Sequence, residues 1–167
     1  MAKVVLKLDN DVSTDVIYAG RFMATVLPNE TPQFAFADLK EFNGRLTRKE
    51  IPPGSVIVAG ENFGCGSSRE QAVSCLKGHQ LVVVAKTFAR IFLQNSVNLG
   101  LPTITVPDIA AREGDELELG RDEVVNKATG QRFKIRPLSG TRQAMIEAGG
   151  LIPYTRARLL ARAAPRQ

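Results

Sequence analysis

One run of residues, 60–72, combines side chains and spacing that suit chemistry on a small anion. It reads Gly-Glu-Asn-Phe-Gly-Cys-Gly-Ser-Ser-Arg-Glu-Gln-Ala. Its glycines let the backbone turn tightly and approach a ligand closely. Ser67 and Ser68 supply hydroxyl groups, and Arg69 adds a planar fork of donors that matches a carboxylate. The run therefore predicts a binding site for a small carboxylate or phosphate ligand.

The two serines also have a purely structural interpretation. Ser67 or Ser68 can cap a helix, with Glu70 or Gln71 completing a capping box three residues later. The start of a helix carries unpaired N–H groups and a partial positive charge, which attract anions. A serine acts as a base only when its alkoxide is stabilised, and a helix start beside Arg69 would contribute to that. The flanking glycines and the arginine favour a ligand site over capping alone.

Apolar and amphipathic stretches alternate around this run. The apolar residues 55–59 lead directly into the glycines, and 81–85 form a continuous apolar run of the kind buried on both faces of a sheet. We expect strands at 55–59, 81–85 and 103–106, and helices at 71–76 and 87–99. In the second helix the residues expected to face the core are Phe88, Ile91, Phe92 and Val97. Strands that alternate with helices favour a parallel sheet with right-handed crossovers.

The flanking segments predict smaller elements. We expect a strand at 4–8, a loop at 18–33, a helix at 34–42 that stops at Asn43-Gly44, antiparallel hairpins at 115–136 and a helix at 140–148. The predicted fold class is therefore α/β. A short parallel sheet is flanked by helices and joined by a small antiparallel part.

Composition is that of an ordinary globular domain. The chain has 167 residues, of which 44% are hydrophobic and 23% charged, so it has the length for a core and the apolar content to form one. No apolar run approaches the roughly 20 residues of a membrane span. The first residues lead into a strand and lack a signal-peptide layout. We therefore expect a cytoplasmic protein.

Positive charge is concentrated in residues 154–167, a basic C-terminal tail. The formal net charge is +5, and the tail arginines without acidic neighbours are Arg156, Arg158, Arg162 and Arg166. A basic surface is one requirement for binding nucleic acid. Aromatic residues are few and are not interleaved with the basic ones, and no RNA- or DNA-binding motif is present. A solvated or partner-facing tail is therefore favoured, and a non-catalytic anion- or RNA-binding module stays open as an alternative.

Cysteine and histidine are too sparse for an iron–sulfur cluster or a tetrahedral zinc in this chain. Cys65 and Cys75 lack metal-ligand spacing, and an iron–sulfur cluster or a tetrahedral zinc usually takes three or four ligands. A cysteine in a glycine turn ahead of a helix is also a candidate nucleophile. His79, the single histidine, lies at the far end of the next helix, so a Cys/His or Ser/His hydrolase has weak support.

Four further charged residues are candidates for a site. Asp11 and Asp15, in a polar turn after the first strand, could hold a cation or orient a catalytic group, although such turns more often only reverse the chain. Lys86 and Arg90 stand at the beginning of the second helix. They could face an anion, with a solvated helix start as the equally supported alternative.

Three segments, taken in this order, resemble one known family. They are Asp11-Val12-Ser13-Thr14-Asp15, Asn62-Phe63-Gly64-Cys65-Gly66-Ser67-Ser68-Arg69-Glu70 and Ala85-Lys86-Thr87-Phe88-Ala89-Arg90-Ile91-Phe92. From about residue 7 to residue 153 the chain resembles the small subunit of the isopropylmalate isomerase and homoaconitase group. That subunit corresponds to the mobile C-terminal swivel domain of aconitase. The resemblance implies a layered β/β/α swivel domain at residues 1–153.

The resemblance also implies a hydro-lyase. In this family water is lost from a malate-like dicarboxylate and re-added through an enoate intermediate, which moves a hydroxyl to the adjacent carbon. A large subunit carries a [4Fe–4S] cluster that binds the substrate at an open iron position as a Lewis acid. The implied partner is that large subunit, in a heterodimer or heterotetramer, with no cofactor in this chain. The isopropylmalate branch of the family serves leucine biosynthesis.

The resemblance assigns roles to four residues by their match to the family motifs. Ser67 would be the base that removes the proton beside a substrate carboxylate. Arg69 would clamp a substrate carboxylate, and Ser68 would help to hold it. Asp15 would be an active-site carboxylate that orients the catalytic network. The Asp15-Val16 pair departs from the more common Asp-Asp.

The loop after Asp15 bears on the substrate. Homoaconitase-type chains resemble Tyr-Leu-Arg-Thr there, and the arginine pairs with an extra carboxylate, whereas this chain has Phe22-Met23-Ala24-Thr25. Ala24 would leave a third carboxylate unpaired, which is costly when it is buried. This favours an alkyl-malate, converted from 2-isopropylmalate to 3-isopropylmalate, over homocitrate or citrate. Ala24 and Thr25 are the expected substrate-binding residues of the loop. Subunits of the citramalate, dimethylmalate and homoaconitase types stay open as alternatives.

Overall fold

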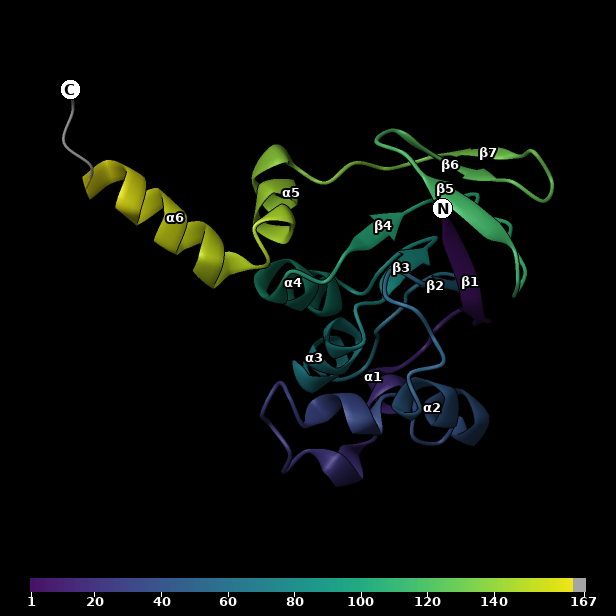
Figure 1. Cartoon of the computed structure of the whole chain (residues 1–167), viewed down its shortest axis with the longest axis horizontal. Coiled ribbons are helices and arrows are strands. Elements are labelled where there is room, and N and C mark those ends of the chain that lie inside the picture. Colours follow the sequence, from purple (N-terminus) through teal and green to yellow (C-terminus); the bar gives the residue numbers. More distant parts are fainter. Residues whose placement is uncertain (164–167) are drawn as a thin grey trace.

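In the computed structural model, which describes residues 1–163, one seven-stranded sheet runs through the molecule (Figure 1). The strands lie in the order β4-β3-β2-β1-β5-β6-β7. Their bounds are β1 Ala2–Lys7, β2 Val56–Ala59, β3 Val82–Ala85, β4 Thr103–Thr105, β5 Glu116–Leu119, β6 Glu123–Asn126 and β7 Arg132–Lys134.

The sheet has a parallel half and an antiparallel half that meet at β1. Strands β1 to β4 pair in parallel, as in the register of Val56 with Val82. On its other edge β1 pairs antiparallel with β5, and β5, β6 and β7 continue as a meander. An isolated bridge between Thr105 and Arg136 brings the two ends of the sheet together, so the sheet is curled. The predicted α/β class, with its parallel and antiparallel parts, is confirmed.

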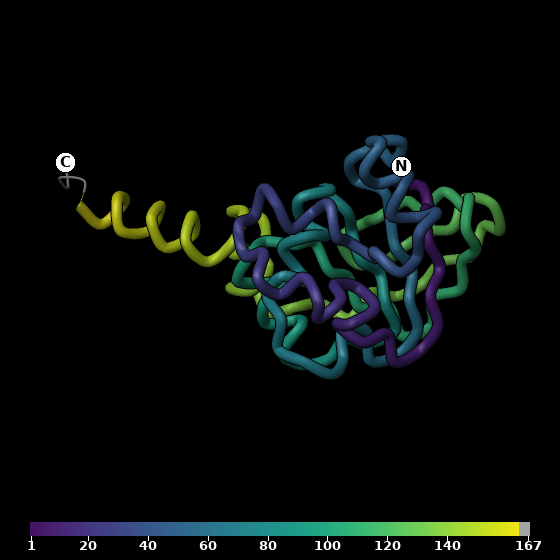
Figure 2. Tube along the Cα trace, turned by 90° about the horizontal axis from the view of Figure 1, so that it is seen from below, coloured from purple at the N-terminus to yellow at the C-terminus, as the bar shows by residue number. Residues whose placement is uncertain are grey.

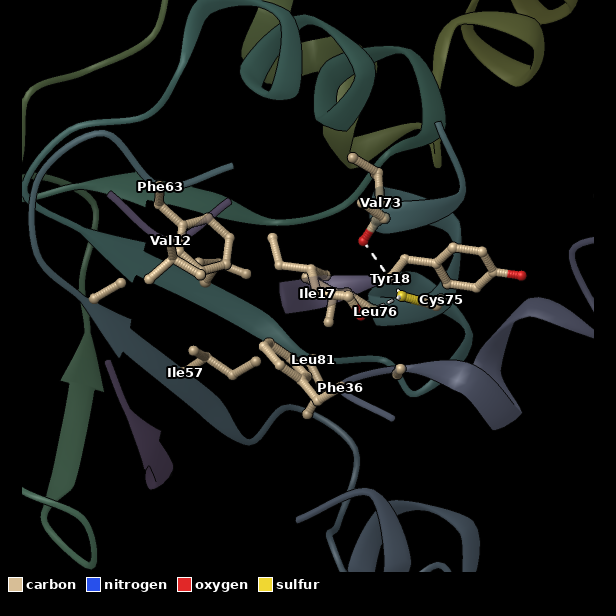
Figure 3. Close-up of a cluster of buried hydrophobic side chains, with 14 of the residues drawn as sticks. Val12, Ile17, Tyr18, Phe36, Ile57, Phe63, Val73, Cys75, Leu76 and Leu81 are labelled. Carbon is tan, nitrogen blue, oxygen red and sulfur yellow. Dashed lines mark hydrogen bonds between the residues drawn. The ribbon is translucent and has the colours of Figure 1, made fainter. Parts of the chain in front are cut away.

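Helices cover one face of the parallel half. The α-helices are α1 Thr14–Ile17, α2 Lys40–Thr47, α3 Gln71–Gly78, α4 Arg90–Leu99, α5 Gly140–Glu147 and α6 Leu151–Ala163, with short 3₁₀ helices η1 Gly20–Phe22 and η2 Thr31–Phe34. One buried cluster joins α1 to α4 to the sheet, and Figure 3 shows part of it around Ile17, Phe36 and Leu76. Burial of these side chains fixes the loops that connect the strands to the helices.

The apolar runs of β2 and β3 explain why the parallel half is buried on both faces. Ile57 belongs to the cluster on the helical side, while its neighbours Val56 and Val58 belong to a second cluster. That second cluster also contains Leu117 and Val124 of the antiparallel half. Successive side chains of a strand point to opposite faces, so a continuous apolar run requires cover on both.

Two helix predictions need correction. The helix expected at 34–42 is wrong: η2 ends at Phe34, Phe36 has a left-handed φ of 51°, and α2 then runs through Asn43-Gly44. The Asn43 side chain donates to the carbonyl of Ala35 at 2.8 Å, which ties this turn to α2. The loop expected at 18–33 contains η1 and the start of η2.

The helix expected from Thr87 begins at Arg90, because Thr87 and Phe88 pair with the glycine-rich loop instead. Phe92 and Val97 are buried as predicted, whereas Ile91 is 40% exposed and does not face the core. Gly100 ends α4 in the left-handed conformation, with φ at 74°.

The last helix, α6, extends away from the rest of the molecule in two perpendicular views (Figures 1 and 2). All of its residues are exposed except the half-buried Tyr154. It carries Arg156, Arg158 and Arg162 of the predicted basic tail, while Arg166 lies outside the described residues. Within residues 1–163, no helix has the length and apolar character to cross a membrane.

Candidate active site

Loops from three adjacent strands meet at the carboxyl edge of the parallel half. They follow β1, β2 and β3, and they stay paired beyond the strands through the parallel bridges Ser13–Cys65 and Phe63–Phe88. The carboxyl ends of parallel strands are where open α/β sheets bind ligands. The loops thereby bring the Asp11–Asp15 turn against the glycine-rich run, which the sequence leaves far apart.

The glycines in this run are required by its conformation. Gly64 and Gly66 have φ values of 80° and 90°, a region that favours glycine. A Cβ atom on Gly64 would lie 2.2 Å from Cγ of Phe92, so the ring of α4 occupies the space of any side chain there. Phe92 also packs edge-on against Phe63, with ring centroids 5.2 Å apart. The loop is therefore seated directly on α4.

Asp11 and Asn62 form a hydrogen-bonded contact between the Asp11–Asp15 turn and the glycine-rich run. Both have left-handed backbones, with φ of 55° and 59°, and Asn62 Nδ2 donates to Asp11 Oδ1 at 2.7 Å. Asp11 was a candidate cation ligand or orienting group, and here its carboxylate accepts from the neighbouring loop. Asn62 was not singled out by sequence reasoning, although its short amide side chain suits both a left-handed turn and a side-chain hydrogen bond.

Ser67 is held through its backbone by Thr14. The N–H of Ser67 donates to Thr14 Oγ1 at 3.2 Å, and Thr14 Oγ1 lies 3.4 Å from the Ser67 carbonyl oxygen as a donor. The Thr14 N–H donates to the Cys65 carbonyl at 2.8 Å. These contacts involve the main chain of Ser67 and not its hydroxyl group.

The predicted capping role of the serines is wrong. Helix α3 begins at Gln71 with Glu70 as its N-cap residue, and within the described chain no side chain caps it. The irregular stretch from Ser67 to Arg69 lies ahead of the helix, because it is paired with the Thr14-Asp15 segment. The argument for an anion site therefore depends on Arg69 rather than on a helix start at the serines.

Arg69 is paired with Asp15. Arg69 Nη1 lies 2.5 Å from Asp15 Oδ1, and it also donates to the Tyr18 carbonyl at 3.4 Å. The Arg69 side chain is only 13% exposed, whereas that of Asp15 is 61% exposed. Arg69 Nε is buried and has no hydrogen-bond partner within residues 1–163. The structure thus brings together two residues that the family motifs had assigned to one site.

The pKa of the Asp15 carboxyl group reflects its pairing with Arg69. The Arg69 side chain, by hydrogen bonding, holds the pKa of Asp15 below its ordinary value of 3.8, against the opposing effect of desolvation. The Gly20 N–H, 3.2 Å from Asp15 Oδ1, acts in the same direction as the arginine. Because the folded-state pKa is the lower one, the pair stabilises the fold above the unfolded-state pKa. That stabilisation is lost as the pH falls through the folded-state pKa.

We expect an NMR titration of the Asp15 carboxyl carbon in the full chain to have its midpoint below 3.8. In Arg69→Gln the midpoint should move back up, because the charged donor is gone. Arg48→Gln serves as the matched control, since Arg48 pairs with Glu50 on another part of the surface. A midpoint that is the same in Arg69→Gln and in the native chain would contradict the pairing.

Ser68, Ala24 and Thr25 lie in less buried surroundings. Ser68 is exposed, and its carbonyl accepts from Asn95 Nδ2 at 3.2 Å. Ala24 is exposed, and the carbonyl of Thr25 accepts from the Tyr18 hydroxyl at 3.2 Å. These contacts show how the two loops are anchored, and the substrate-binding roles of the three residues stay predictions.

The loop that carries Ala24 rests against both Asp15 and α3. Gln71 Nε2 donates to the Met23 carbonyl at 3.4 Å, close to a cavity of about 480 Å³ lined by Val26, Glu70 and Gln71 among others. Arg21, the cation of this loop, makes two hydrogen bonds to Asp38. The charge of Arg21 is therefore already matched by a carboxylate.

Lys86 and Arg90 lie in different surroundings. Lys86 lines a cavity of about 620 Å³ that lies between the ends of β1 and β2 and the antiparallel half, with Asn10, Gly60 and Asn126 among its other walls. Arg90 is exposed at the start of α4. Neither residue has an assigned role.

The two cysteines lie in different surroundings. Cys65 Sγ donates to the Asp11 carbonyl at 3.4 Å, whereas Cys75 is fully buried in the helical-side core, where desolvation raises the pKa of its thiol. Across the part of the chain that the structure describes, no three His, Cys, Asp or Glu side chains form a group that could hold a metal ion. His79 contacts the Pro32 carbonyl at 2.9 Å beyond the end of α3, so it is not paired with Cys65.

Comparison with known proteins places this chain in a family. Residues 29–109 match the model of the aconitase C-terminal domain. A crystal structure from Methanocaldococcus jannaschii titled as a 3-isopropylmalate dehydratase superposes with a TM-score of 0.85, at 36% identity, covering 96% of each chain. The curled sheet and its carboxyl-edge loops therefore define an aconitase-type C-terminal domain.

Relatives with curated names indicate which kind of aconitase-type protein this chain is similar to. The chain is 41% identical to the 3-isopropylmalate dehydratase small subunit of Moorella thermoacetica, over 87% of this chain and 88% of that one. It is 40% identical to the isopropylmalate/citramalate isomerase small subunit of Methanocaldococcus jannaschii, over 93% of each. The chain belongs to the 3-isopropylmalate dehydratase small-subunit family.

Proposed function

We propose that this chain is the small subunit of a hydro-lyase that converts 2-isopropylmalate to 3-isopropylmalate by dehydration and rehydration. The observation that carries the proposal is the joining of Ser67 and Arg69 to the Thr14-Asp15 segment at one sheet edge. The names of the relatives supply the reaction, and the small-subunit family implies a large-subunit partner in general. A cytoplasmic location stays a prediction of the sequence.

In the proposed reaction, Arg69 binds a substrate carboxylate and Ser67 exchanges a proton with the adjacent carbon. The C–H proton passes to the Ser67 alkoxide, and the C–H electron pair becomes the C=C double bond as the C–O bond on the neighbouring carbon breaks. The hydroxyl leaves with the electron pair of that C–O bond, as hydroxide that a Lewis acid of the partner subunit would take up. In rehydration a hydroxide adds to the carbon that lost the proton, and Ser67 returns its proton to the carbon that lost the hydroxyl, which restores the alkoxide. Arg69 favours this chemistry because carboxylate binding by a planar arginine fork fixes the position of the acid.

The placement of Arg69 beside Asp15 supports the assignment of a carboxylate ligand, because one partner holds the guanidinium in place at the sheet edge. In our proposal Asp15 holds Nη1 and thereby orients the guanidinium, while the substrate acid uses its remaining donors. Ser68, next to Arg69, would add a hydroxyl contact to the same carboxylate.

We propose that the cluster expected for this family lies in the large subunit, because this chain has two cysteines and such a cluster usually takes three or four ligands. When bound there, such a cluster would supply a Lewis acid for the leaving hydroxyl. This chain would contribute the base, the carboxylate clamp and one wall of the substrate pocket. The subunits would form a heterodimer or heterotetramer.

The loop at residues 22–25 supports the choice of substrate class. Ala24 presents a methyl group, so this position offers no cation to a third carboxylate. An apolar substituent of the substrate therefore fits against this loop better than an acidic substituent does. Citramalate is a second candidate substrate, since one relative is named an isopropylmalate/citramalate isomerase.

The test is anaerobic co-purification of this chain with its cognate large subunit, followed by ultraviolet absorbance of the enoate. Isopropylmalate, citramalate and homocitrate are compared at equal concentration. We expect turnover only in the complex, with an alkyl-malate preferred. Preference for homocitrate would overturn the substrate assignment, and a complex without turnover on any of the three acids would overturn the reaction.

A further inference from the structure

We propose that Thr14 is a positioning residue for Ser67, and that its side-chain hydroxyl sets the placement of the proposed base. The inference rests on the proposed function, and it assigns a task to a residue outside the proton-transfer and carboxylate-binding set. Thr14 is 1% exposed, so water does not compete for its hydroxyl. That hydroxyl accepts from the Ser67 N–H and faces the Ser67 carbonyl oxygen as a donor.

A helix-capping role for this hydroxyl is not supported by its contacts. Thr14 is the first residue of α1, and the N-cap position is occupied by Ser13. The hydrogen bonds of the Thr14 side chain within residues 1–163 go to both backbone groups of Ser67. One side chain thus fixes the donor and the acceptor of the same peptide segment, which restrains the rotation of Ser67 as well as its position.

The next residue along the chain performs the matching task for the carboxylate clamp. Asp15 pairs with Arg69, while the Thr14 N–H donates to the carbonyl of Cys65. Two consecutive residues of one turn therefore hold residues 65, 67 and 69 of the other loop. Thr14 and Asp15 together therefore set how Ser67 and Arg69 are placed relative to each other. The Thr14 contact and the Asp15 contact can each be removed by a separate mutation.

This separation predicts a specific kinetic pattern. Loss of the Thr14 hydroxyl should displace Ser67 while Asp15 still holds Arg69, so kcat should fall and KM should stay nearly unchanged. A displacement on the order of 1 Å costs about 100-fold in rate. We expect Thr14→Val in the assembled enzyme to lower kcat by about 10- to 100-fold, with KM changed by less than about 2-fold.

Thr14→Ser is the matched control, since it keeps the hydroxyl and removes the methyl group. It should retain kcat within about 2-fold, whereas Thr14→Ala should show the loss seen in Thr14→Val without placing a methyl group against the Ser67 N–H. Turnover is expressed per assembled complex, so poor assembly does not count as a loss. Equal losses in Thr14→Ser and Thr14→Val, or a rise in KM alone, would overturn the inference.

A second readout needs no turnover. Amide hydrogen exchange of Ser67 in the full chain should accelerate in Thr14→Val and Thr14→Ala and stay native in Thr14→Ser, because the N–H loses its acceptor. Unchanged exchange in all three variants would overturn the inference. Ser67→Ala, measured in parallel, distinguishes a failure of the proposed function from a failure of this inference. Full activity in Ser67→Ala would contradict the assignment of Ser67 as the base. An inactive Ser67→Ala beside a fully active Thr14→Val would contradict only the role of Thr14.

Discussion

Ser67→Ala in the assembled enzyme is expected to lower kcat by about 10²- to 10⁴-fold, the usual contribution of a side chain that transfers a proton in the transition state. The backbone contacts of Ser67 with Thr14 do not involve the hydroxyl that is removed. The loop should therefore keep its conformation, and assembly with the large subunit should be native. The measurement is the rate of enoate formation and of rehydration per purified complex.

The matched control is Ser139→Ala, a change of the same size in the loop ahead of α5, remote in sequence from the glycine-rich run. It should leave kcat and KM unchanged. Substantial turnover in Ser67→Ala, with the complex intact, would show that another group removes the proton. Loss of the complex in Ser67→Ala would instead indicate that the hydroxyl contributes to the subunit interface.

Arg69→Lys should raise the KM for the alkyl-malate by about 10- to 100-fold, because a hydrogen bond to a charged group contributes roughly 1.5–3 kcal/mol. Lysine keeps the charge but not the planar fork, so it cannot hold Asp15 and a substrate carboxylate in the same geometry. The guanidinium is largely buried, which limits the solvent that could replace its lost contacts. Steady-state kinetics of the complex would measure the change.

Arg48→Lys makes the same exchange in an exposed pair with Glu50 and should leave kinetics unchanged. A pair exposed to this degree contributes little to stability, so the control tests the chemistry of the exchange and not folding. If Arg69→Lys also had native KM and kcat, the substrate acid would have to be bound elsewhere. The role of Asp15 as an orienting carboxylate would then lose its basis.

Local patterns in the sequence predict the parallel half well. The apolar residues of β2 and β3 are followed by turn-forming residues and then by helical spacing, and this order leaves few arrangements other than a parallel sheet. The glycine-rich loop is also readable, because Gly64 and Gly66 adopt the backbone conformations that glycine favours. Ser67 and Arg69 could be selected as candidate site residues because they come directly after those glycines in the sequence.

Long-range contacts are what sequence reasoning missed. Thr14 and Asn62 are ordinary residues in their own segments, and their importance arises from pairing with a loop about fifty residues away in the chain. The same limit applies to the start of α3, where contacts with the Thr14-Asp15 segment keep Ser67 to Arg69 out of the helix. It also applies to β1, whose antiparallel partner β5 lies in the other half of the sheet.

The position of β1 between the two halves of the sheet has a consequence during synthesis of the chain. β1 is made first, yet its residues pair with β2 at Val56 and with β5 at Leu117. Residues emerge from the ribosome at about 5–20 per second, so β1 waits many seconds with one edge unpaired. An exposed strand edge is a template for pairing with other chains. The nascent small subunit should therefore be most prone to aggregate, and most dependent on chaperones, until β5 has emerged.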